Sequence, residues 1–342
     1  MTVLLTGATG FLGAALANRL LTRGHTLRCV VRGATDEERR AKLHAALPDA
    51  DQRRLEVVAG DLAARDLGRS AAELAALGQG VTHVVHCGAR VNMTLPYTAL
   101  HRTNVGATET LLSLAETASA AFCYVGSLAA VARTVTGEPF ELIDPVSGGY
   151  GQSKWAADRL VSVAHQEGRV RAVILRPGRA TADSRTALGN PDDLLEQVLR
   201  LCLRLGVAPA LETGVRLSPV DWMAELAVLL AERAPAQGRA YHLVRAESLR
   251  WGEVLDVLRE VRPELARLPY PSWRELVTEA GRTDPGTARL ATSLPPQPLV
   301  FDGHPANRPT NARRTLTDAH PEPPAAEMLL RASVAVWERD RP

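Results

Sequence analysis

Tyr150 and Lys154 are four residues apart in the stretch Tyr150-Gly-Gln-Ser-Lys154. If this stretch is helical, the two side chains lie on one face. An ammonium group beside a phenol stabilises the phenolate and lowers the pKa of the phenol toward working pH. Tyr150 is therefore a candidate general acid. A surface helix on which the tyrosine merely stacks against the lysine would show the same spacing, so both interpretations stay open here.

Lysine is rare in this chain, which draws attention to Lys154. Of the 40 Lys and Arg residues, only Lys42 and Lys154 are lysines. A guanidinium group is planar and always charged, whereas the lysine ammonium is compact. A lysine at position 154 therefore indicates a place where the compact ammonium is needed.

A serine completes a possible catalytic set. Ser127 follows the apolar run Phe122–Gly126, which predicts a buried strand. Ligands collect at the carboxyl ends of parallel strands, so Ser127 can donate to a carbonyl oxygen that Tyr150 also faces. Each such donor is worth ~10²–10³ in rate when negative charge develops on the oxygen. We predict that Ser127, Tyr150 and Lys154 are catalytic residues for hydride transfer to a carbonyl carbon; a strand-end cap is the alternative for Ser127 alone.

Residues 1–24 indicate the scaffold that would position this set. Thr2–Thr6 predicts a buried strand, Gly7-Ala-Thr-Gly10-Phe-Leu-Gly13 follows, and Ala14–Arg23 has a helical pattern that ends at Gly24. A strand, a glycine-rich turn and a helix form the binding site for a dinucleotide pyrophosphate, because the backbone approaches the phosphates and the helix start faces the anion. The predicted cofactor-binding residues of this turn are Gly7, Thr9, Gly10, Phe11, Leu12 and Gly13.

The second predicted strand ends at a basic residue, which favours NADPH. Leu27–Val31 is followed by Arg32, where NAD-binding proteins usually have an acidic residue on the ribose. Arg32 can bind a 2′-phosphate through two N–H groups, and Lys42 can add a second cation. Solvated side chains without a ligand remain the alternative for both residues.

Further cofactor contacts are predicted at the ends of later elements. Asp61 can accept from the adenine amino group, or it is an ordinary turn aspartate. Asn104 can hold an active-site backbone group or a water, or it is only a polar helix residue. With Tyr150 and Lys154, the remaining predicted cofactor-binding residues are Leu62, Ala89, Pro177 and Gly178. His83 and His86 are expected to be packed or surface side chains rather than ligands.

Composition limits the possible functions. The 342 residues carry a net charge of +2, with acids and bases interspersed, which does not support nucleic-acid or polybasic membrane binding. Neither a signal peptide nor an apolar run of membrane-spanning length is visible, and the four cysteines form no C-x-x-C motif. We expect a reduced, cytoplasmic protein with no bound metal, no nucleic-acid partner and no membrane association.

The predicted fold class is α/β: a Rossmann-type doubly wound parallel sheet with a smaller, mostly helical C-terminal substrate lobe. We assign residues 1–180 and 214–246 to the NADP-binding domain, and residues 181–213 and 247–342 to the lobe. Residues 215–220 and 241–244 are expected to be strands that return to the main sheet. A long surface loop is expected over residues 281–311. The amphipathic helix at 191–205 either docks a carrier, lines an acyl channel or packs the lobe.

These motifs resemble those of the extended short-chain dehydrogenase/reductases. The shared stretches are Thr6-Gly7-Ala-Thr-Gly10-Phe-Leu-Gly13, Gly60-Asp61-Leu62, Ser127, Tyr150-x-x-x-Lys154 and Arg176-Pro-Gly178. Within that group the chain is most similar to the thioester reductase domains that end nonribosomal peptide synthetases, polyketide synthetases and carboxylic acid reductases. This closer likeness includes Cys29-Val-Val-Arg32, Cys87-Gly-Ala-Arg-Val-Asn92, Gly148-Gly-Tyr-Gly-Gln-Ser-Lys-Trp155, Arg176-Pro-Gly-Arg179 and Ser218-Pro-Val-Asp-Trp222.

The resemblance implies an NADPH-dependent reduction, in secondary metabolite biosynthesis, of an acyl thioester to an aldehyde, with further reduction to the alcohol left open. The thioester would be held on coenzyme A or on the phosphopantetheine arm of a carrier protein, which we expect to arrive in trans. The chain departs from the family at Gly126-Ser127, where Ser-Thr is frequent, and at Met93, where an aromatic residue is frequent. The alternatives are an extended reductase acting on a sugar nucleotide or a free ketone or aldehyde, and a nonenzymatic NADP-binding sensor.

Overall fold

The computed structural model describes residues 1–233, 237–301 and 309–339. The chain forms two compact units. The first comprises Met1–Gly178, Val220–Val244 and Ala306–Pro321, and the second comprises Arg179–Pro219, Arg245–Pro305 and Glu322–Pro342.

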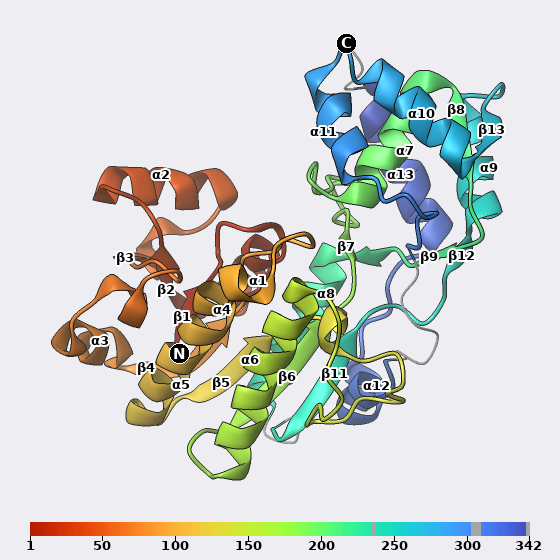
Figure 1. Cartoon of the computed structure of the whole chain (residues 1–342). Helices are drawn as coiled ribbons and strands as arrows, with labels where there is room; N and C mark the ends of the chain where they lie inside the picture. Colours follow the sequence, from red (N-terminus) through yellow and green to blue (C-terminus); the bar gives the residue numbers. More distant parts are fainter. Residues whose placement is uncertain (234–236, 302–308, 340–342) are drawn as a thin grey trace. The chain divides into compact units, whose positions relative to one another are not determined.

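The first unit contains a seven-stranded sheet in the order β11-β6-β5-β4-β1-β2-β3 (Figure 1). Every neighbouring pair in it is parallel. The strands are β1 (Thr2–Thr6), β2 (Thr26–Val31), β3 (Leu55–Ala59), β4 (Val81–His86), β5 (Ala121–Val125), β6 (Ala172–Pro177) and β11 (Arg239–Leu243). The chain reverses its direction of travel across the sheet between β1 and β4, and this switch point is where dinucleotides bind in doubly wound folds.

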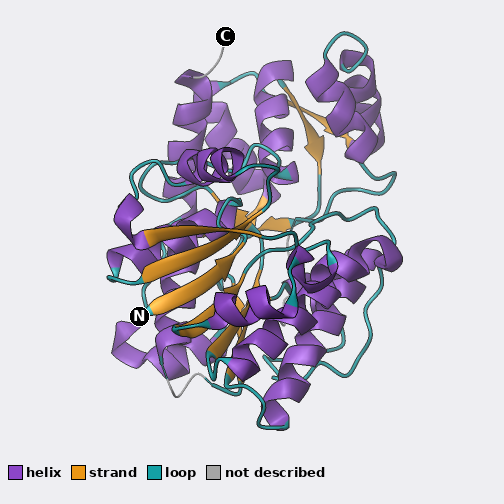
Figure 2. Cartoon of the chain, turned by 90° about the vertical axis from the view of Figure 1, so that its left-hand side faces the viewer, coloured by secondary structure: helices purple, strands orange, loops and turns teal. Residues whose placement is uncertain are grey.

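Helices cover this sheet, as Figure 2 shows. Helix α1 packs on α8, whereas α5 packs on both α3 and α6. The helices are α1 (Phe11–Thr22), α2 (Asp36–Ala46), α3 (Ala71–Gly78), α4 (Tyr97–His101), α5 (Ala107–Thr117), α6 (Gly149–Gln166), α8 (Val220–Glu232) and α12 (Thr310–Leu316). A π-helical turn, Arg102–Gly106, joins α4 to α5.

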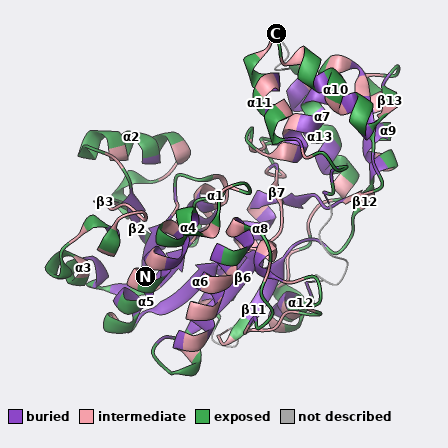
Figure 3. Ribbon diagram, in the orientation of Figure 1, coloured by how far each residue is buried: buried purple, intermediate pink, exposed green. Residues whose placement is uncertain are grey.

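Apolar strands and helix faces form the core of the first unit. Strand β5 is buried at all its positions, and β1 and β6 are buried at all but one (Figure 3). Continuous apolar runs of this kind are typical of strands that are covered on both faces. The predicted Rossmann-type α/β fold is confirmed.

The second unit is mostly helical, with three two-stranded sheets formed by β10–β7, β12–β9 and β13–β8. Its helices are α7 (Leu194–Leu205), α9 (Trp251–Val261), α10 (Tyr270–Ala280), α11 (Pro285–Ser293) and α13 (Ala326–Arg339), and its strands are β7 (Ala180–Thr181), β8 (Val207–Ala210), β9 (Gly214–Val215), β10 (Ser218–Pro219), β12 (Leu249–Arg250) and β13 (Ala266–Pro269). A separate apolar cluster, which includes Leu199, Trp251 and Trp273, packs this unit. The apolar face of α7 belongs to this cluster.

Two expectations about this part of the chain are wrong. Residues 215–220 do not join the main sheet, because β9 pairs with β12 and β10 pairs with β7. Residues 281–311 are not one surface loop, because Asp284 caps α11 through its side chain and Leu290 is buried; residues 302–308 of that range lie outside the described residues. Proline starts this helix rather than preventing it, since proline fits a first helical turn. Of the described residues, 309–321 also belong to the first unit rather than to the lobe.

Candidate functional site

The glycine-rich turn after β1 is tightly packed and leaves the start of α1 open to a ligand. Gly7 has φ +80°, and a Cβ on it would lie 2.7 Å from the Gly88 backbone nitrogen. A Cβ on Gly13 would overlap the Gly7 oxygen. Gly10 precedes α1 with an extended backbone, no side chain caps the helix, and its first turn has no acidic residue. These features fit a dinucleotide pyrophosphate, which takes backbone N–H groups at a helix start.

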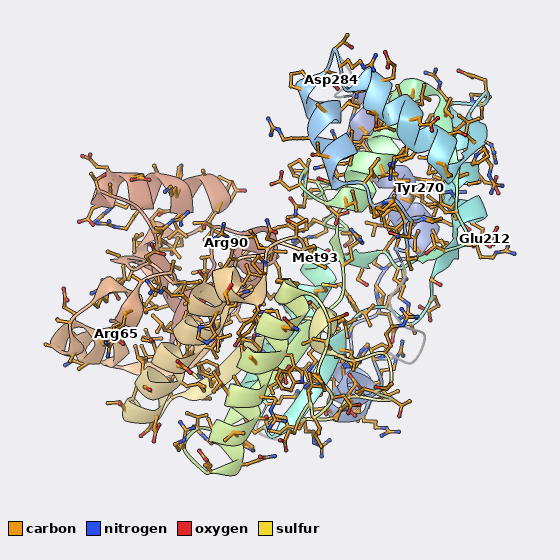
Figure 4. All side chains as sticks on the ribbon, in the orientation of Figure 1. Arg65, Arg90, Met93, Glu212, Tyr270 and Asp284 are labelled. Atoms are coloured by element: carbon orange, nitrogen blue, oxygen red, sulfur yellow. The ribbon has the colours of Figure 1, made fainter. Side chains whose placement is uncertain are left out.

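Two glycines bring neighbouring segments against the start of α6. A Cβ on Gly149 would overlap the Leu95 oxygen, and one on Gly151 would lie 2.7 Å from the Ala129 oxygen. The segment after β4 and the turn after β5 therefore both pack on the helix turn that carries Tyr150. Arg90 and Met93 (Figure 4) belong to the segment after β4, and Met93 is 71% exposed.

Tyr150 is buried, and Ser127 reaches its side chain. Burial raises the pKa of Tyr150, and a hydrogen bond between its side chain and that of Ser127 lowers it. Ser127 itself caps the short turn after β5, where its Oγ accepts from the Ala129 nitrogen at 3.1 Å. The strand-end cap proposed as an alternative and the contact with Tyr150 therefore occur together.

Lys154 lies one helical turn beyond Tyr150 and is 3% exposed. Its Nζ donates to the Val125 oxygen at 2.8 Å and lies 4.8 Å from the centre of the Tyr124 ring. Burial lowers the pKa of Lys154 to about 8. The sequence predicted that Lys154 would lower the pKa of Tyr150, but burial of the phenol holds that pKa above its ordinary value.

Asn104 lies in the π-helical turn and is 1% exposed. Its side chain accepts from the Arg90 nitrogen at 2.7 Å and donates to the Arg90 oxygen at 3.1 Å and to the Ser153 Oγ at 2.9 Å. Asn104 therefore holds a backbone group of the segment after β4, one of the two interpretations offered from the sequence. Ala89 lies in the same segment, directly after Gly88.

The two cations expected at a 2′-phosphate lie together after β2. Arg32 is exposed, and the Lys42 Nζ donates to the Arg32 oxygen at 3.1 Å. Lys42 also forms an ion pair with Glu38 at 2.5 Å, so its charge is already partly neutralised. Asp61 accepts from the Ala63 nitrogen at 2.9 Å, as a turn aspartate does. Leu62 packs closely on Gly88, because a Cβ added to Gly88 would collide with the Leu62 Cδ1.

A buried ion pair fixes α6 against the end of β6. Arg176 donates to both carboxylate oxygens of Asp158, at 2.8 and 2.9 Å, and neither side chain is exposed. Beyond it, Pro177 ends β6 and the Gly178 nitrogen donates to the Leu243 oxygen at 3.0 Å. Sequence reasoning missed Asp158, although its position four residues after Lys154 places both on one helix face.

A parallel sheet with a switch point and a glycine-rich turn after its first strand defines a dinucleotide-binding α/β protein. The chain belongs to the NAD-binding family described as male sterility protein, which residues 5–227 match. A nicotinamide cofactor follows from this membership.

Relatives extend the match beyond those residues. A linear gramicidin synthase protein of Brevibacillus parabrevis is 32% identical over 88% of this chain, and the L-2-aminoadipate reductase large subunit of Penicillium chrysogenum is 32% identical over 80%. The chain spans only 6% and 21% of the lengths of these two relatives. The solved terminal R domain from the myxalamid PKS-NRPS biosynthetic pathway is 30% identical, with a TM-score of 0.87 over 99% of this chain and 90% of that one. The resemblance to extended reductases of the terminal reductase-domain type is confirmed.

Among the described residues, no helix has both the length and the apolar composition that crossing a membrane requires.

Proposed function

We propose that the chain is an NADPH-dependent reductase that converts an acyl thioester, bound to coenzyme A or to a carrier protein, into an aldehyde. The observation that carries this proposal is the convergence of Ser127, Tyr150 and Lys154 where β5 ends and α6 begins. Similarity to reductase domains of peptide synthetases and to an aminoadipate reductase supports a thioester substrate.

The chemistry requires a hydride and a proton. A nicotinamide cofactor held at the glycine-rich turn would supply the hydride for the carbonyl carbon. The hydroxyl groups of Ser127 and Tyr150 donate hydrogen bonds to the carbonyl oxygen as it gains negative charge, and Tyr150 then gives it a proton. Lys154 stabilises the resulting phenolate through its ammonium charge. The product is a hemithioacetal, which breaks its carbon–sulfur bond, releases the thiol and leaves the aldehyde.

Cofactor oxidation with a panel of substrates tests this function. We expect NADPH consumption with acyl-coenzyme A or acyl-carrier thioesters, and a loss of several orders of magnitude in turnover in Tyr150→Phe with nearly unchanged cofactor affinity. Tyr270→Phe is the matched control, because that buried phenol lies in the second unit and donates to the Pro295 oxygen. Turnover of free carbonyls alone would assign the chain to a ketone or sugar-nucleotide reaction, and cofactor binding without any turnover would assign it to a sensor.

The preference for NADPH rests on Arg32, which stands exposed after β2 with Lys42 bonded to its backbone. In Arg32→Ala the Michaelis constant for NADPH should rise about tenfold or more, because a charge-assisted bidentate contact is lost, while that for NADH should change little. Arg53→Ala removes an equal charge from an exposed position of the first unit and serves as the control. An unchanged NADPH preference in Arg32→Ala would contradict this assignment.

A further inference from the structure

A buried chain of hydrogen bonds connects the glycine-rich turn to α6. Its members are Thr6 on β1, His86 on β4, Asn104 in the π-helical turn, Thr108 on α5 and Ser153 on α6. Each is at most 1% exposed. Thr6, His86, Thr108 and Ser153 have no part in the hydride chemistry proposed above.

The direction of each bond around His86 follows from Thr108. The Thr108 hydroxyl has one hydrogen, which it donates to the backbone oxygen of Asn104 at 2.8 Å. Its Oγ1 must therefore accept from His86 Nε2, 3.1 Å away. Burial, followed by the nearby charge of Lys154, lowers the pKa of His86 to about 3, so the ring is neutral and Nδ1 is an acceptor. His86 Nδ1 accepts a hydrogen bond from the Thr6 hydroxyl at 2.7 Å. Thr6 Oγ1 in turn accepts from the Gly88 nitrogen at 3.0 Å.

The bonds beyond Asn104 are equally determined. The Ser153 hydroxyl donates to the backbone oxygen of Tyr150 at 2.8 Å, so its Oγ accepts from Asn104 Nδ2 at 2.9 Å. The other Asn104 amide hydrogen goes to the Arg90 oxygen, and its Oδ1 accepts from the Arg90 nitrogen. Every side-chain hydrogen in this chain of bonds therefore has an acceptor.

We propose that His86, as its neutral Nε2–H tautomer, is a positioning residue. It fixes the position of the glycine-rich turn after β1 relative to α6, the helix that carries Tyr150 and Lys154. Thr6 directly precedes Gly7, whose Cα hydrogen faces the Gly88 backbone with no room for a side chain. Thr108 holds Asn104, which in turn holds Ser153 and the backbone of Tyr150. A buried donor without a partner is costly, so displacement at one end destabilises the rest of the chain.

The tautomer can be measured directly. In protein labelled with ¹⁵N-histidine, the imidazole signals that disappear in His86→Gln should show Nε2 protonated and Nδ1 unprotonated. They should not change between about pH 5 and pH 8, the range in which an ordinary histidine titrates. A protonated Nδ1, or a titration in this range, would overturn the proposal. This measurement needs neither substrate nor cofactor.

The coupling is tested through cofactor binding, because the inference rests on the proposed dinucleotide site but not on the thioester. Thr108→Val removes the hydroxyl while keeping the shape, and it should weaken NADPH binding about tenfold in a fluorescence titration, although Thr108 lies away from the glycine-rich turn. Thr108→Ser restores the hydroxyl and should restore affinity. Thr110→Val is the matched control, since the Thr110 hydroxyl makes the same kind of bond to the Gly106 oxygen four residues back.

A double mutant distinguishes coupling from local damage. In the double mutant Thr6→Val with Thr108→Val, the fold loss of NADPH affinity should be smaller than the product of the two single losses. Removing either hydroxyl already interrupts the hydrogen bonds that connect the glycine-rich turn to α6. Losses that multiply, or a Thr108→Val protein with unchanged affinity, would overturn the proposal. If the valine variants do not fold, a protonated Nδ1 in the tautomer measurement would still overturn the proposal. A protein that binds NADPH and shows this coupling but reduces no thioester would disprove the proposed function alone.

Discussion

Lys154 combines burial with an ionisable group that the proposed reaction needs in its charged form. Burial is the main reason why its pKa falls to about 8, and the negative charge of Asp158 opposes that fall. The neighbouring thiol of Cys87 has its pKa raised to about 11 by burial, and the pKa of Tyr150 is raised as well. Lys154 is therefore the group of this site that loses its proton first as pH rises.

The pH dependence of kcat/KM should reflect this ionisation. The ammonium is charged below about 8 and neutral above, so kcat/KM should fall as pH rises through about 8. In Lys154→Arg the remaining activity should be lower but should keep no such descending limb, because guanidinium stays protonated. An identical limb in the arginine variant would assign the ionisation to another group.

At the level of elements, the site depends on how α6 is held against β5 and β6. Gly151 allows the turn that carries Ser127 to approach, and the Arg176–Asp158 pair fixes the helix two turns beyond Tyr150. Arg176 also donates to the oxygens of Pro139 and Phe140, which belong to the segment between β5 and α6. Removing one member of a fully buried pair leaves the other charge without compensation.

Asp158→Asn should therefore lower the free energy of unfolding by about 3–5 kcal/mol in urea denaturation. Loss of the carboxylate also removes a charge that raises the pKa of Lys154, so the descending limb of kcat/KM should move to lower pH. Glu260→Gln is the control, since its carboxylate also accepts hydrogen bonds from a single arginine, Arg331, but is exposed. Equal effects of the two substitutions on the urea midpoint would contradict the role of burial.

At the scale of the whole molecule, the chain leaves the first unit after Val244 and returns to it before α12. Glu138 holds the returning helix. Its Oε2 accepts from the Thr310 nitrogen at 2.9 Å and from the Asn311 nitrogen at 2.5 Å, while its Oε1 accepts from the His242 nitrogen on β11. A carboxylate at a helix start is also favoured by the helix dipole. The Asn311 side chain adds a bond to the Ala240 oxygen.

Glu138→Gln should detach α12 from β11, because an amide group cannot accept from all of these N–H donors. Hydrogen–deuterium exchange should increase in residues 310–316 and 239–243, with a loss of about 1–3 kcal/mol of stability. Glu141→Gln, three residues along the same segment, removes a half-exposed ion pair with Arg159 and should leave exchange in these residues unchanged. Unchanged exchange in Glu138→Gln would show that apolar packing alone holds α12.

The amino-acid sequence alone predicted strands β1, β2, β5 and β11, the glycine-rich turn and the helix that carries Tyr150 and Lys154. Apolar runs, glycine spacing and a four-residue interval depend only on neighbouring residues, so they are readable before the chain folds. Local patterns failed at residues 215–220, where an extended stretch was expected to join the main sheet, and at 281–311, where prolines and glycines concealed α11.

The contacts between buried polar groups became visible only in the folded chain. Thr6 and His86 are eighty residues apart and Glu138 and Asn311 more than twice that, so no periodicity links them. The folded structure also sets the pKa of Tyr150, which burial holds above its ordinary value. Desolvation depends on everything that surrounds a group, and the surroundings of Tyr150 come from α6, the turn after β5 and the segment after β4 together.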